Sequence, residues 1–201
     1  MGAQVEVQLE RYGFFPAGGG IVTAAIEPCA RLHPIELLTR GARRDAYAEA
    51  FAAGIPASVG QRELACIGPR MGWEEVQLRL HVLPGEQGPG NAVLLTLEHE
   101  HVTKVFAGFG ARTVRAEEVA GRAVKEARQY IESEAAVGEH LADQLMLPMA
   151  LAGGGSFTAS TVSQHALTNA AVVARFLPVE IRFERGECHS TCHIRTTCAS
   201  G

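Results

Sequence analysis

The spacing of apolar residues changes period at Ala116, and this change does most to limit the folds open to the chain. Before it, several stretches alternate apolar and polar residues as half-buried strands do, beginning with residues 5–10. After it, Val119, Ala123 and Ala127 recur at helical spacing. Because strands and helices interleave along the chain, the sequence predicts a mixed α/β (α+β) fold.

The same patterns set the expected elements. We predict strands over residues 5–10, 21–26, 46–53, 76–82, 92–98, 102–106, 179–183 and 193–197. We predict helices over residues 56–64 with an end near Gly68, from 116 onward, over 140–151 and over 165–175. Residues 46–53 are ambiguous, because alanine favours helix while Tyr47, Glu49 and Phe51 alternate as in a strand; we favour the strand.

Composition excludes several classes of protein. The chain has 201 residues, of which 47% are apolar and 20% charged, as in soluble globular proteins of one or two domains. It has no apolar run of bilayer length and no export signal, so we expect no membrane partner and a cytoplasmic location. Five cysteines fit reduced thiols better than a disulfide framework. A net charge of −4 argues against sequence-blind binding along nucleic acid, but not against gripping one terminal phosphate.

His165 is the candidate for covalent chemistry. An imidazole can attack phosphorus and hold it as a labile phosphoramidate. Ser163 is placed to cap the helix that follows, and a helix N-terminus favours an anionic phosphate. A lone histidine is nevertheless more often structural or exposed. Asp143 and Gln144, early in their own helix, are either exposed polar positions or contacts to a base, a ribose or a metal.

Glycines and possible metal ligands have simpler interpretations. Residues 18–20 and 153–155 are both Gly-Gly-Gly; either run could admit a phosphate, but a hairpin turn and a helix end are the simpler explanations. Cys188, His189, Cys192 and His193 lack finger spacing and a second ligand pair, so we predict no metal site there. In residues 98–101, His99 and His101 would share one face of a strand, which we interpret as solvated.

Several ordered motifs together resemble the RNA 3′-terminal phosphate cyclase family. They are Arg-Tyr-Gly-Phe-Phe-Pro-Ala-Gly-Gly-Gly at 11–20, Gly-Glu-Gln-Gly-Pro-Gly-Asn at 85–91, Gly-Glu-His-Leu-Ala-Asp-Gln at 138–144, Leu-Pro-Met-Ala-Leu-Ala-Gly at 147–153, Ser-Gln-His-Ala-Leu-Thr-Asn at 163–169 and Phe-Leu-Pro at 176–178. The resemblance runs from the start of the chain to about Phe183.

The resemblance implies a fold and a site. Family members carry βαβαββ repeats, and here residues 1–38 and 133–201 would form part of the catalytic domain, interrupted by a smaller α/β insert over 39–132. His165 would be the adenylylated nucleophile. The ATP pocket would include His140, Leu141, Ala142, Asp143 and Gln144. ATP and a divalent cation, Mg²⁺ or Mn²⁺, would be required.

It also implies a reaction of the ligase class. His165 would attack the α-phosphorus of ATP, and the AMP would pass to an RNA 3′-phosphate. The 2′-hydroxyl would then form a 2′,3′-cyclic phosphate. Because the chain begins near the signature at Arg11, it resembles a C-terminal half. We expect the missing repeats to leave strand edges and apolar surface uncovered, which favours self-association. The alternatives are a non-catalytic scaffold in RNA processing or ribosome assembly, and an inactive fragment.

Overall fold

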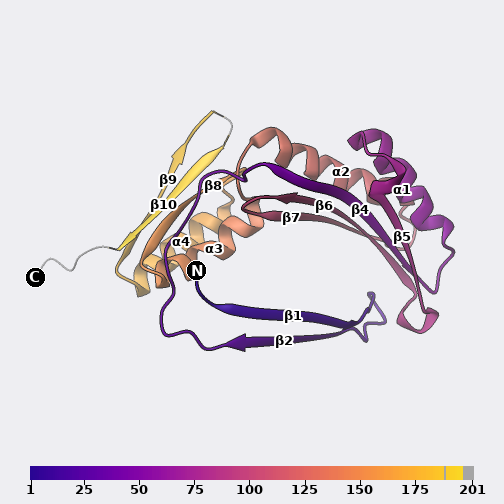
Figure 1. Cartoon of the computed structure of the whole chain (residues 1–201), viewed down its shortest axis with the longest axis horizontal. Helices are drawn as coiled ribbons and strands as arrows, with labels where there is room; N and C mark the ends of the chain where they lie inside the picture. The colour runs from indigo at the N-terminus through magenta and orange to yellow at the C-terminus, as the bar shows by residue number, and fades with distance from the viewer. Residues whose placement is uncertain (188, 197–201) are drawn as a thin grey trace, which may run out of the picture.

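The computed structural model describes residues 1–187 and 189–196, and in them two four-stranded sheets and a separate hairpin (Figure 1). The strands are β1 (Gln4–Arg11), β2 (Ile21–Glu27), β3 (Ile35–Leu37), β4 (Arg43–Ala53), β5 (Leu78–Leu83), β6 (Gly90–His99), β7 (Thr103–Phe109), β8 (Gly154–Ala159), β9 (Val179–Arg185) and β10 (Ser190–Thr196). The helices are α1 (Ser58–Met71), α2 (Ala116–Ser133), α3 (Glu139–Leu151) and α4 (Gln164–Phe176), with short 3₁₀ turns at Glu75–Gln77 and Gly85–Gln87. The predicted mixed α/β class is confirmed.

The first sheet has the strand order β5-β4-β6-β7 and carries α1 and α2 on one face (Figure 1). Its central strand β4 runs parallel to β5 and antiparallel to β6. Ala46, Ala48 and Ala50 of β4 are buried under the helices, where small side chains let the helices pack close to the sheet. The predicted strand over residues 46–53 is therefore confirmed, because alternation and burial outweigh the helix preference of alanine.

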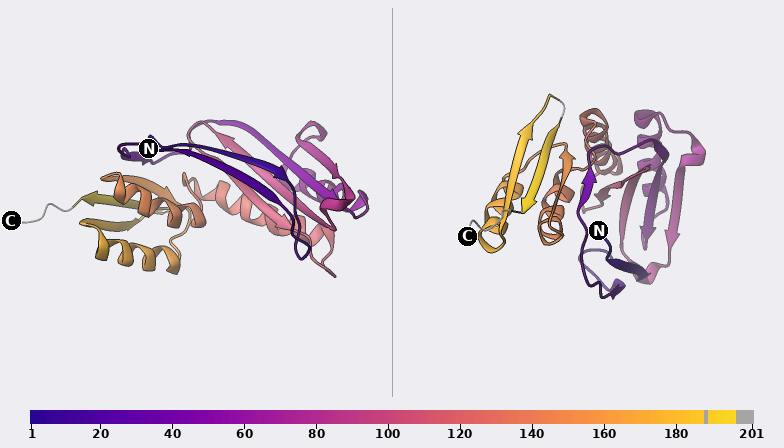
Figure 2. Two further views of the ribbon diagram at one scale, coloured as in Figure 1. Left: turned by 90° about the horizontal axis from the view of Figure 1, so that it is seen from below. Right: turned by 60° about the vertical axis from the view of Figure 1, so that its left-hand side comes forward.

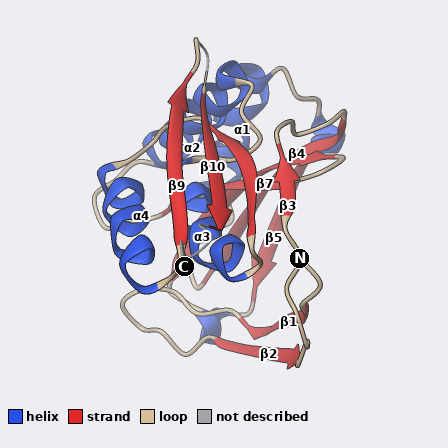
Figure 3. Cartoon of the chain, turned by 90° about the vertical axis from the view of Figure 1, so that its left-hand side faces the viewer, coloured by secondary structure: helices blue, strands red, loops and turns tan. Residues whose placement is uncertain are grey.

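The second sheet has the order β3-β8-β10-β9, and α3 and α4 pack against it and each other (Figure 3). Met146, Met149, Phe157 and Ile194 are fully buried in this second core. The two cores are separate clusters of residues. The division of the chain into residues 1–38 with 133–201, and 39–132, stays a prediction.

The β1–β2 hairpin corrects one expectation. Its seven- and eight-residue strands pair antiparallel, as predicted, but every residue of both is exposed except Arg11, so neither strand is half-buried. Figures 1 and 2 show the hairpin on the side of the first sheet opposite α1 and α2. It is attached near its tip, where Arg11 Nη2 donates to the Glu86 carbonyl at 2.9 Å. Val7, 65% exposed, belongs to the uncovered apolar surface that we expected.

The largest difference from the predicted elements is β8. We expected Gly153–Gly155 only to end the preceding helix, but Gly154 and Gly155 lie inside a central strand that pairs with both β3 and β10. Gly155 has φ +138°, and a Cβ there would overlap the carbonyl oxygen of Ile35. The absence of a side chain at Gly155 therefore allows β3 to approach β8 closely, and no turn forms there.

Smaller differences concern where elements begin and end. Helix α1 continues through Pro69 to Met71 and ends at Gly72, whose φ of +69° suits a C-cap. Strand β5 starts two residues later than predicted, after a 3₁₀ turn, and β10 starts three residues earlier. No described helix is long and apolar enough to cross a membrane.

Candidate active site

His165 is the second residue of α4, and its side chain is exposed. The helix and its predicted cap are confirmed, since Ser163 Oγ accepts a hydrogen bond from the Ala166 amide at 3.1 Å. This cap uses one of the first amides of the helix, while those of the first turn remain directed outward. The sequence thus places an open imidazole beside a region of positive helix potential.

The predicted nucleotide-binding residues divide between two faces of α3. His140, Asp143 and Gln144 are spaced three and four residues apart, so they share one face. His140 and Gln144 are exposed and Asp143 is half-buried. Leu141 and Ala142 turn toward the second core instead. Only the first three side chains are placed to meet a ligand directly.

Asn169 joins the two helices. Its amide nitrogen donates to the carbonyl oxygen of Asp143 at 3.0 Å and to the Asp143 carboxylate at 2.9 Å. Because short connections link β8 to α3 and to α4, both helices run opposite to β8 and their N-termini lie at one end. His165 is four residues before Asn169 and therefore on the same face of α4. The contact brings the faces of α3 and α4 that carry these residues side by side, which spacing alone did not reveal.

A cavity of about 680 Å³ opens at the start of α3. Its lining comes from elements of both sheets. It includes Lys104 of β7, Glu126 of α2 and His140 of α3. Gly138 precedes α3 with no side-chain cap, and a Cβ there would lie 3.3 Å from Lys104 Nζ. Burial lowers the pKa of Lys104, and the charge of Glu126 partly opposes this effect. Lys104 is a candidate contact that the sequence did not indicate, because it stands alone in a strand far from the motifs.

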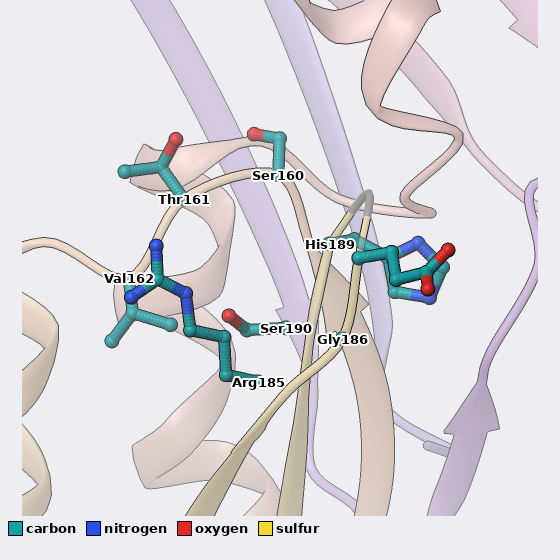
Figure 4. Close-up of a pocket in the computed structure, with 8 residues that line it drawn as sticks. Ser160, Thr161, Val162, Arg185, Gly186, His189 and Ser190 are labelled. Atoms are coloured by element: carbon teal, nitrogen blue, oxygen red, sulfur yellow. The ribbon is translucent and has the colours of Figure 1, made fainter.

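A second cavity, of about 460 Å³ and drawn in Figure 4, shares two lining residues with the first. Ser160 and Thr161, in the loop between β8 and α4, line both. The opposite wall is the β9–β10 hairpin, from which Arg185 directs its guanidinium toward Thr161 and Val162 (Figure 4). His189 Nδ1 lies 3.3 Å from the Ser133 carbonyl and ties this hairpin to the end of α2.

The C-terminal Cys/His group does not converge within the described residues. Cys188 lies outside them; Cys192 is fully buried, and burial raises the pKa of its thiol to about 12. His193 follows it on the other face of β10. The described part of the chain has no group of three or more His, Cys, Asp or Glu side chains placed to hold a metal.

The predicted pairing of His99 and His101 is wrong. Strand β6 ends at His99, and His101 lies in the turn before β7, so the two do not share a strand face. His99 Nδ1 is also buried without a partner among the described residues rather than solvated. Burial, with Arg40 nearby, lowers the pKa of His99. The turn interrupts the alternation at Glu100.

Comparison with known proteins places the chain in a family. The family model described as RNA 3′-terminal phosphate cyclase matches residues 1–183. A protein of that name from Pseudomonas fluorescens is 49% identical over 181 residues, 90% of this chain and 53% of the relative. Relatives from Pseudomonas aeruginosa and Salmonella agona are 48% and 46% identical, covering 90% and 92% of this chain.

The chain spans about half the length of the curated relatives it matches, 53% of each of these three. The matched region contains α3, α4 and every motif quoted for the resemblance. It ends at Phe183, where we expected the similarity to end. The chain belongs to the RNA 3′-terminal phosphate cyclase family.

Proposed function

We propose that the chain carries the nucleotide-transfer site of an ATP-dependent RNA 3′-terminal phosphate cyclase, with His165 as the nucleophile. The observation that carries this proposal is the Asp143–Asn169 contact, which holds α3 against α4 one turn after His165. A histidine and two helix N-termini therefore occupy one end of the second sheet, where they can hold a phosphate chain. The relatives' name supports the substrate class.

The proposed chemistry has three balanced steps. A ring nitrogen of His165 forms a bond to the α-phosphorus of ATP, and pyrophosphate leaves with the electrons of the broken P–O bond. An oxygen of the RNA 3′-phosphate then attacks the same phosphorus, breaks the N–P bond and frees the imidazole. Finally the 2′-hydroxyl, losing its proton to solvent, attacks the RNA phosphorus and AMP leaves.

The residues of α3 would bind and orient ATP. His140 has a flat ring on the open face and suits contact with a base. Gln144 can donate and accept hydrogen bonds. Asn169 fixes one oxygen of Asp143 and so sets the orientation of that carboxylate. Leu141 and Ala142 would act by holding the helix against its core.

A divalent cation fits this donor set only in a limited way. Mg²⁺ commonly takes one or two protein carboxylates and completes its shell with water and substrate phosphates. Asp143 and Glu139, both in the first turns of α3, are the carboxylates that could hold such an ion. When bound, the ion would neutralise phosphate charge.

The test is incubation with ATP labelled at the α-phosphate and Mg²⁺ or Mn²⁺, followed by denaturing electrophoresis. We expect acid-labile label on the wild-type chain and none on His165→Ala. His101→Ala, which removes another exposed imidazole, should label like wild type. A folded wild-type chain that takes no label under any condition would refute catalysis by this chain. That outcome would favour the non-catalytic scaffold or inactive-fragment reading.

The cellular setting is also a proposal. The described thiols Cys29, Cys66 and Cys192 are free, which suits a reducing compartment such as the cytoplasm. Self-association through the uncovered apolar surface is a further expectation, tested below.

A further inference from the structure

Helices α1 and α2 lie side by side on one face of the first sheet, and a groove follows the seam between them (Figure 1). Two cavities, of about 380 and 420 Å³, form this groove, and Arg70 lines both. One wall is the face of α1 that carries Cys66 and Arg70, and the other is the face of α2 that carries Gly121 and Arg128. Of the lining residues, only Gln129 also borders the cavity at the start of α3. The groove is therefore a different surface from the candidate active site.

The groove contains three cations that have no ion-pair partner. Within the described residues, Arg70, Lys125 and Arg128 form neither an ion pair nor a side-chain hydrogen bond. Arg62, at one end, is different, because its Nε and Nη2 donate to the Glu117 carboxylate at 2.7 and 2.8 Å. Lys125 and Arg128 are three residues apart on α2 and so are neighbours, and their like charges repel each other. An anionic ligand would relieve this repulsion.

Gly121 makes room for one of these cations. A Cβ at this position would lie 2.9 Å from Arg70 Nη1, so the guanidinium occupies the space that the absent side chain leaves. This is where the two cavities meet, since Arg70 lines both. Ala65, Pro69 and Val124 give the groove an apolar lining. The groove thus combines unpaired positive charge with apolar surface.

We propose that the groove binds an acidic segment of a partner protein, with carboxylates against Arg70, Lys125 and Arg128 and small apolar side chains against the apolar lining. Clusters of arginine commonly recognise acidic motifs, and grooves between elements accommodate peptide segments. A protein segment fits better than an RNA backbone, because Glu117 and Glu132 also line the groove and would repel a continuous row of phosphates. The net charge of −4 also disfavours binding along a nucleic-acid backbone. The inference does not depend on the proposed function.

The test measures binding of a short fluorescent peptide of Glu, Ala and Leu to the full chain by fluorescence anisotropy. We expect saturable binding of this peptide and none of a control peptide with Gln in place of Glu. Arg70→Met keeps the aliphatic stem and removes the charge, and it should raise Kd about fivefold. The double variant Lys125→Met/Arg128→Met should raise Kd about tenfold. Arg44→Met, which removes an exposed cation outside the groove, should bind within about twofold of wild type.

Two further measurements locate the bound peptide. Gly121→Gln fills the groove without a change of charge and should raise Kd about tenfold, which charge attraction alone would not produce. Cys66 lines the groove, whereas Cys29 is an exposed thiol outside it. The acidic peptide should therefore slow the alkylation of Cys66 by iodoacetamide and leave that of Cys29 unchanged, as measured by mass spectrometry.

Several results would overturn the inference. They are no saturable binding of the acidic peptide by the folded wild-type chain, wild-type affinity in the groove variants, and a Cys66 that the peptide does not protect. RNA that displaces the peptide and loses affinity in the same variants would assign the groove to nucleic acid instead. Loss of self-association in Arg70→Met would assign it to a second copy of the chain. Labelling at His165 should be unchanged in the groove variants, so a failure of the proposed function and a failure of this inference are observed separately.

Discussion

Glu63 offers the sharpest test of the structure, because it is a carboxyl group buried in α1 with no exposed surface. The Asn91 side chain donates to its Oε1, while Oε2 has no partner among the described residues. Burial raises the pKa of Glu63 to about 7, although the hydrogen bond from Asn91 opposes the rise. Asn91 ends the Gly-Pro-Gly-Asn loop, so this motif residue has a structural partner.

The direction of the pH effect follows from this raised value. Below a pH of about 4.5, Glu63 is protonated in both the folded and the unfolded state, so its ionisation does not lower the free energy of unfolding. As the pH rises, Glu63 ionises first in the unfolded state, and the free energy of unfolding falls. This fall is complete once the pH passes about 7, the pKa of Glu63 in the folded state. At 1.36 kcal/mol per pH unit, the interval between 4.5 and about 7 corresponds to about 3 kcal/mol in the free energy of unfolding.

Glu63→Gln removes this titration and keeps the size of the side chain and its acceptor for Asn91. Urea unfolding at about pH 5 and about pH 8 measures the gain of the variant over wild type at each pH. We expect the gain to be larger at the higher pH by about 2–3 kcal/mol. The exposed Glu132→Gln should show no such difference. Parallel pH dependence in wild type and Glu63→Gln would refute a raised pKa at this site.

Three further changes test the packing and the surface. Asn169→Ala removes both bonds to Asp143 and should lower the free energy of unfolding by about 1–3 kcal/mol in urea melts, with weaker labelling at His165; unchanged labelling would separate this contact from the site. Gly155→Ala puts a Cβ against the Ile35 carbonyl and should lower the free energy of unfolding by more than about 3 kcal/mol. A variant that melts at the temperature of wild type would contradict the tight pairing of β3 with β8. Val7→Glu places a charge on the exposed hairpin and should reduce self-association, measured by multi-angle light scattering. A wild-type chain that stays monomeric at high concentration would show that the exposed apolar surface does not cause self-association.

Local signals in the sequence were enough for some features. The Ser163 cap and the helix after it were predicted because a cap and a 3.6-residue period act over a few residues. Strand β4 was predicted despite its alanines, since the alternation of Tyr47, Glu49 and Phe51 reflects burial on one face. These patterns depend little on what lies across the fold.

Features set by distant neighbours were missed. Gly154 and Gly155 read as a turn, yet β3 and β10 make them part of a strand. The apolar residues of β1 read as half-buried, yet the structure puts no layer against them. Lys104 gave no signal at all, because only the approach of Gly138 and α2 makes it part of a cavity. In the site, the sequence supplied the residue types, and the Asp143–Asn169 contact supplied their arrangement.

The pairing of β8 with β3 and β10 has a consequence for the order in which the chain can fold during synthesis. Residues 46–130 hold every member of the first core, so that unit can close before β10 is made. The second core must wait for Ile194, because β10 joins β8 to β9 and is made last. Until then Phe157 and the methionines of α3 lack one wall, and this interval is when the nascent chain has most need of a chaperone.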